Sequence, residues 1–168
     1  MMQVARFLDR INNRIGISVS YAIFIITALM LLAVVMRRFL NLPNIWTYET
    51  TQFFFGAYFI LAGGYALAKR MHVNMDILYN RLSLRGKAII DLVTSLLFFL
   101  FICLLVWTTW KQGWSSFQMR EATDSAWAPP VYPIKLVIPI GAFLVLLGGI
   151  SKFITDVYTA IKGRPYEY

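Results

Sequence analysis

The hydrophobic residues of this chain are grouped into four long runs that contain no charged residue. The runs are Ile15–Met36, Thr50–Ala68, Leu92–Trp110 and Leu136–Ser151. A helix that crosses a bilayer needs about 20 apolar residues, so three runs are long enough and the fourth is slightly short. The fourth can still cross if Lys135, just before it, extends its ammonium group to the headgroups. The pattern therefore predicts four membrane-spanning helices, over approximately residues 15–36, 48–68, 90–112 and 133–160.

The segment before the first run has the periodicity of an amphipathic helix. Apolar residues recur at helical spacing (Val4, Phe7, Leu8, Ile11, Ile15), and polar ones take the other faces (Arg6, Asp9, Arg10, Asn13, Arg14). Such a helix lies on a membrane surface. Gly16 alone does not force a break, so a separate helix and one continuous with the first spanning helix both stay open.

Composition and charge agree with an all-α integral membrane protein of one domain, residues 1–168. Hydrophobic residues make up 59% and charged residues 14% of the chain, against about 25% charged in soluble domains. Eleven Lys and Arg residues lie in the N-terminal segment, the middle loop and the tail, and five in the other two loops. By the positive-inside rule, both termini are cytoplasmic. This topology and anionic membrane lipid account for the net charge of +8, so nucleic acid is not an expected partner.

Every Asp, Glu, Lys, Arg and His of the chain falls in a loop or at the boundary of an apolar run, whereas such residues inside a membrane usually mark ion or substrate pathways. We therefore expect that the chain alone does not move a solute. A haem-binding anchor needs histidines inside its helices, and the one histidine, His72, lies in a loop. His72 and Asp76 are too few ligands for a structural metal. No phosphate loop, nucleophile elbow or carboxylate pair appears, so we expect neither an enzyme nor a cofactor.

Small residues are concentrated in the second and fourth predicted helices. Glycines let helix backbones approach closely in lipid, which makes helix packing the expected role of five of them: Gly63, Gly64, Gly141, Gly148 and Gly149. At the start of the second helix, Thr47 is the expected N-cap, and Glu49 would lie in the first turn near the positive end of the helix dipole.

Three local patterns follow one another along the chain. They are Trp46-Thr47-Tyr48-Glu49 at the start of the second predicted helix, His72-Val73-Asn74-Met75-Asp76 after it, and Ile138-Pro139-Ile140-Gly141 in the fourth. With the length and the predicted topology, they resemble the small membrane subunit (DctQ-like small permease) of tripartite ATP-independent periplasmic (TRAP) transporters. The resemblance covers nearly the whole chain.

The resemblance implies a function that depends on partners in the bacterial inner membrane. A large membrane subunit would carry an organic acid and the coupling sodium, and a periplasmic substrate-binding protein would deliver the acid. This chain would then be a non-catalytic scaffold, with Trp46, Glu49, His72 and Asp76 as subunit-contact or structural residues. Two other classes stay open, a self-contained small carrier that works as an oligomer and a membrane anchor of a redox complex.

Overall fold

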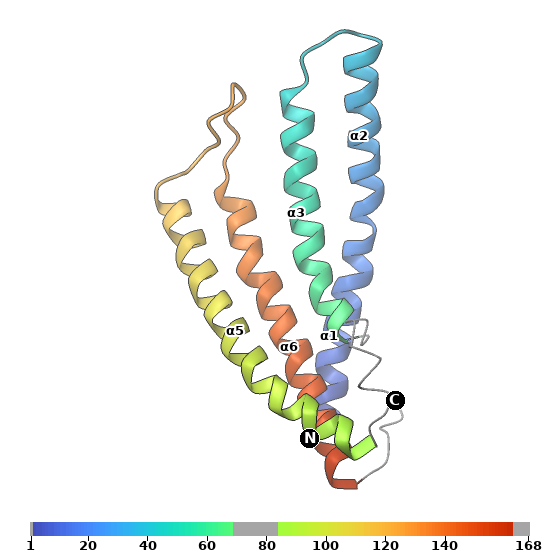
Figure 1. The fold of residues 1–168 in the computed structure, drawn as a ribbon. Coiled ribbons are helices and arrows are strands. Elements are labelled where there is room, and N and C mark those ends of the chain that lie inside the picture. The colour runs from blue at the N-terminus through green and yellow to red at the C-terminus, as the bar shows by residue number, and fades with distance from the viewer. Residues whose placement is uncertain (1, 69–83, 163–168) are drawn as a thin grey trace.

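The computed structural model describes residues 2–68 and 84–162, and helices account for nearly all of this part of the chain. The helices are α1 (Met2–Ser20), α2 (Ala22–Arg38), α3 (Ile45–Ala68), α5 (Leu84–Gln118) and α6 (Tyr132–Lys162) (Figure 1). The described residues contain no strand, and the one isolated bridge joins Ala122 to Pro130. The prediction of an all-helical protein is confirmed.

Helices α1 and α2 form one nearly continuous rod. Only Tyr21 separates them, and its backbone is itself helical, with φ −67° and ψ −19°. The amide of Phe24 donates to the Tyr21 carbonyl at 3.2 Å, which carries the chain from one helix into the next. Gly16 lies inside α1 and does not break it. The amphipathic segment and the first apolar run are therefore parts of the same rod.

Helices α2, α3, α6 and α5 lie side by side in a row, in that order (Figure 1). Among the described helices, α5 packs closely against α6 alone, α6 also packs against α3, and α3 packs against α2. Helix α1 lies against both α3 and α6. We call the end that carries residues 39–44 and 119–131 the loop end, and the opposite end the α1 end.

Three stretches of the described chain are long and apolar enough to cross a membrane. They are Gln3–Arg38, Ile89–Gln118 and Tyr132–Ile161. Helix α3 is not among them, although its 24 residues are enough for the length. Its first turns carry the polar residues Glu49, Thr51 and Gln52, and the rest of the helix is apolar.

The helix bounds extend beyond those expected from the apolar runs. Helix α5 begins at Leu84 and ends at Gln118, so the loop after it is shorter than the charge pattern suggested. Helix α3 begins at Ile45, which places Thr47 within its first turn. The expectation that Thr47 caps the helix is wrong. Its buried hydroxyl instead donates a hydrogen bond to the Asn44 carbonyl at 2.7 Å. This bond can form because the carbonyl lies one helical turn before Thr47.

Pro139 lies inside α6 without ending it. Because proline has no N–H, the carbonyl of Lys135 loses the donor that residue 139 would supply in an unbroken helix. Gly113 of α5 packs at this carbonyl, and a Cβ atom there would lie 2.9 Å from the Lys135 oxygen. The missing side chain at Gly113 thus lets α5 approach α6 at the turn that the proline loosens.

Candidate subunit-contact surface

Helices α3 and α6 are held together at backbone distance by glycines. A Cβ atom on Gly64 would lie 2.8 Å from Leu144 Cβ, and one on Gly141 would lie 2.9 Å from the Ile60 carbonyl oxygen. Gly63 is less tightly placed, since its Cβ would meet Val145 Cγ2 at 3.3 Å. These approaches make the middle of the row a close backbone-to-backbone contact, of the kind that small residues permit in lipid.

Two further glycines of α6 meet different helices. A Cβ on Gly148 would lie 3.2 Å from the Asn12 amide nitrogen and 3.3 Å from the Gly64 carbonyl oxygen. Asn12 of α1 is thereby enclosed, with only 1% of its surface exposed. Gly149 faces the ring of Phe98 on α5. Helix α6 therefore contacts α1, α3 and α5 through different glycines.

Charged side chains join α5 to α6 near the α1 end. The ammonium of Lys152 lies 3.1 Å from the Asp91 carboxylate and 3.2 Å from that of Asp156. The hydroxyl of Ser151 donates to the Ala5 carbonyl of α1 at 3.3 Å. Sequence reasoning missed this cluster. The spacing of Lys152 and Asp156, four residues apart on a helix, could have predicted their ion pair. The partner on α5, Asp91, could not be predicted from the sequence, because it comes close only in the folded chain.

At the loop end, Trp46 and Glu49 lie on neighbouring positions of one face of α3, since residues three apart on a helix are adjacent. The side chain of Glu49 accepts a hydrogen bond from the Thr123 hydroxyl at 3.4 Å. Trp46 is 38% exposed. His72 and Asp76 lie outside the described residues, so the structure brings together only the first two of the four predicted contact residues.

Residues 119–131 form a compact hairpin at the loop end. The amide of Thr123 donates to the Pro129 carbonyl at 3.0 Å, and that of Val131 donates to the Glu121 carbonyl at 2.9 Å. The Lys135 ammonium bonds both oxygens of the Glu121 carboxylate, at 2.7 and 2.6 Å. This hydrogen-bonded cation lowers the pKa of Glu121. The hairpin is thus fastened to the first turn of α6 and, through Thr123, to α3.

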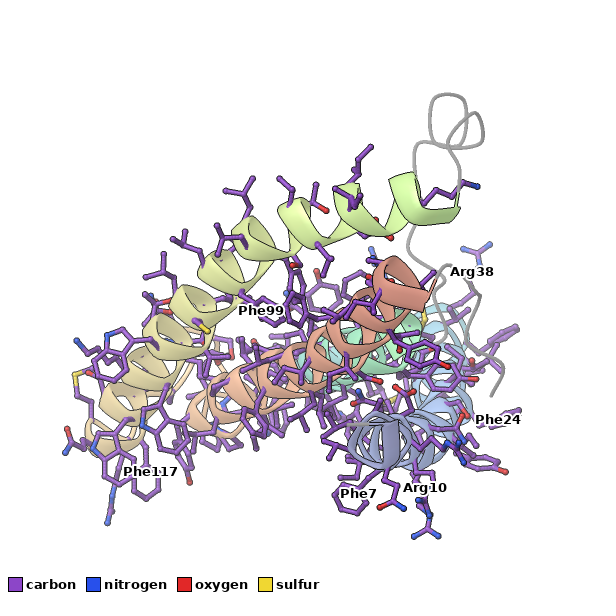
Figure 2. All side chains as sticks on the ribbon, turned by 90° about the horizontal axis from the view of Figure 1, so that it is seen from below. Phe7, Arg10, Phe24, Arg38, Phe99 and Phe117 are labelled. Carbon is purple, nitrogen blue, oxygen red and sulfur yellow. The ribbon has the colours of Figure 1, made fainter. Side chains whose placement is uncertain are left out.

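Large apolar side chains cover the two outer helices of the row. On α5 they face away from α6 and include Val93, Leu96, Leu97, Leu100, Phe101 and Leu104. On α2 they include Ile23, Phe24, Met30, Leu31, Val34 and Val35. Figure 2 shows Phe24 pointing outward from the rod, whereas Phe99 lies between α5 and α6, where its ring meets that of Phe153 at 5.6 Å.

The described residues hold no group of three or more His, Cys, Asp or Glu side chains that could bind a metal ion. What this part of the chain offers is a set of apolar faces, with polar side chains gathered at the two ends of the row. Exposed apolar area of this extent marks contact with lipid or with another membrane protein.

Residues 26–159 match a family described as tripartite ATP-independent periplasmic transporters, DctQ component. The chain belongs to this family. The match begins within α2 and ends within the last turn of α6, so it includes all of α3 and α5 and most of α2 and α6. The DctQ component is the small membrane component of TRAP transporters, which work as complexes. No curated protein sequence matches this DctQ chain.

Proposed function

We propose that this DctQ chain is a non-catalytic scaffold for the large membrane subunit of a TRAP transporter. That subunit would take up an organic acid together with sodium, after a periplasmic binding protein delivers the acid. The chain would cross the bacterial inner membrane four times, with both termini in the cytoplasm. Membership of the family and the packing of the helices support the proposal.

The observation that carries it is the arrangement of the helices in a single row. A row one helix thick leaves apolar side chains on its outer helices and its faces, and only 6% of the most hydrophobic window of α5 is buried. Lipid can cover one side of such a row, but the other is a large flat surface suited to a second membrane protein. The close approaches at the glycines favour a fixed arrangement of the row, which is what a support for a moving neighbour requires.

The directions of the helices support four crossings. Helices α2 and α3 run antiparallel and meet at residues 39–44, and α5 and α6 run antiparallel and meet at the hairpin (Figure 1). If α2 crosses the membrane, α3 returns beside it, because the two helices pack against each other. The polar side chains at the start of α3 also have partners, since Thr47, Thr51 and Glu49 each make a hydrogen bond, as a helix that enters lipid requires.

Within this proposal, Trp46 and Glu49 are contact residues for the large subunit at the periplasmic end. His72 and Asp76, carried over from the resemblance, are proposed as structural or contact residues at the cytoplasmic side. Gly63, Gly64, Gly141, Gly148 and Gly149 are proposed to fix the row.

The experiment is co-expression of the tagged chain with a large membrane subunit of a TRAP transporter, followed by co-purification and uptake. We expect the two proteins to elute together and to accumulate the organic acid in vesicles only when the binding protein and a sodium gradient are present. The chain reconstituted alone should show no uptake. Uptake by the chain alone would favour an oligomeric carrier, and co-purification with a redox enzyme would favour an anchor.

A further inference from the structure

The α2–α3 hairpin carries a groove that the scaffold role does not explain. It has a volume of about 560 Å³ and is open along one side. On α2 the lining residues are Ile26, Met30, Ala33, Val34 and Arg37. Their spacing of four, seven, eight and eleven residues from the first places them on a single helix face.

Helix α3 and the residue before it line the other wall with the same spacing, through Asn44, Tyr48, Thr51, Gln52 and Phe55. Because the two helices are antiparallel, Arg37 and Asn44 lie together at the loop end, and Ile26 and Phe55 lie together at the far end. The groove is therefore polar and cationic at one end and apolar at the other.

The length of the groove matches one leaflet of a membrane. Eleven residues separate Ile26 from Arg37, which is about 16 Å along a helix that rises about 1.5 Å per residue. Half of a hydrocarbon core about 30 Å thick is about 15 Å. A groove of this length begins near the middle of the bilayer and places Arg37 at the level of the headgroups.

The charge at the loop end is available for a ligand. The ion pairs of the described chain join Lys135 to Glu121 and Lys152 to Asp91 and Asp156, and none involves Arg37. The Asn44 amide, by contrast, is already engaged, donating to the Ala33 carbonyl at 2.8 Å. This bond holds the polar end of the groove in place. Tyr48 and Gln52 are exposed beside it and can donate hydrogen bonds.

We propose that this groove binds one phospholipid of the leaflet at the loop end, with its phosphate on Arg37 and an acyl chain along Met30, Val34 and Phe55. A guanidinium pairs with phosphate through two parallel hydrogen bonds, and every phospholipid presents a phosphate at this depth. A partner helix would need a carboxylate at that same level. The site depends on the topology proposed above but not on the identity of the transport partner.

The test uses the full chain in vesicles of phosphatidylethanolamine and phosphatidylglycerol that contain a trace of phosphatidylethanolamine with a photoactivatable acyl chain. Labelled residues are mapped by mass spectrometry of peptides. We expect labelling of Met30, Val34 or Phe55 that survives exchange into mild detergent, and we expect Arg37→Gln to lose most of it. Arg37→Lys should keep part of it, because it retains the positive charge.

Two controls separate a bound lipid from lipid that merely surrounds the protein. Arg38→Gln removes a neighbouring charge that does not line the groove and should leave the labelling unchanged. Leu97 and Leu100 on the outward face of α5 report unspecific contact, and their labelling should be the same in every variant and should be lost in detergent.

Groove labelling that is insensitive to Arg37→Gln, or that is lost in detergent like that of α5, would overturn the proposal. So would a photocrosslinker at Val34 that captures the large subunit in the assembled complex, because a protein helix would then fill the groove. Failure of the chain to co-purify with the large subunit, with groove labelling intact, would refute the scaffold role and leave the lipid site standing.

Discussion

Substitution of Gly141 by alanine tests whether the α3–α6 contact holds the row together. The new Cβ atom would lie 2.9 Å from the Ile60 carbonyl oxygen and 3.0 Å from the Ile60 carbonyl carbon, and it would overlap the Ile60 side chain. These backbone atoms cannot rotate away, so the two helices have to separate. Overpacking of this kind costs about 1–3 kcal/mol.

An opposing effect reduces this loss. Alanine is favoured over glycine inside a helix by about 0.5–1 kcal/mol. The net expectation for Gly141→Ala is a loss of about 0–2.5 kcal/mol, which changes the unfolding equilibrium by a factor of up to about 70. The assay is thermal unfolding of the purified chain in mild detergent, followed by helical circular dichroism.

Gly56→Ala is the matched control. Gly56 lies on the same helix pair, but its Cβ would meet only Ile134 Cδ1 at 3.9 Å, an ordinary contact. This variant should be as stable as the wild type or slightly more so. If Gly141→Ala is at least as stable as Gly56→Ala, the close approach of α3 and α6 does not stabilise the row, and the packing argument fails.

Three further predictions concern topology, assembly and pH. A cytoplasm-active reporter should be active when fused after Tyr168 and inactive when inserted near Ala122, and the opposite result would reverse the proposed orientation. We propose that Glu49 meets a basic group of the large subunit, and losing one partner of such a buried pair costs about 3–5 kcal/mol. Glu49→Gln should therefore reduce recovery of the large subunit, while Glu167→Gln should not. Equal recovery would limit Glu49 to its contact with Thr123. Because the native pKa of Glu121 is lowered by Lys135, its ion pair stabilises the hairpin above the unfolded value of about 4.5 and is lost as pH falls through the lower native value. Amide exchange at Val131, compared at each pH with Glu121→Gln, should converge with that of the variant in acid, and a constant difference would contradict the assignment.

The sequence predicted the helical class because long uncharged runs permit few other structures in a membrane. It did not predict the helix ends, since polar turns such as Leu84–Lys87 and Lys111–Gln118 continue a helix beyond the apolar run. The first turn of α3 likewise begins before the apolar run. In such turns the backbone hydrogen bonds of the helix continue although the side chains become polar. The hydropathy of the sequence therefore does not show where the helix ends.

The order of the helices in the row could not be predicted from the sequence either. Glycine positions indicate where backbones can approach, but not which helix comes near: Gly149 faces Phe98 on α5, while Gly148 faces Asn12 on α1. Gly113, which meets the carbonyl freed by Pro139, was not singled out because it lies beyond the apolar run. The roles of Glu49 and the five glycines stay predictions for the experiments above, as do those of His72 and Asp76.

The position of α6 in the row has a consequence for how the protein is made. Helix α6 is the last of the described helices in the sequence, yet it lies between α3 and α5 and also contacts α1. During synthesis, α5 therefore enters the membrane before the helix that joins it to the earlier ones. Until α6 follows, the α1–α3 segment and α5 lack their principal contact. A chain that ends before residue 132 should therefore leave α5 and the α1–α3 segment in the membrane without the helix that packs between them.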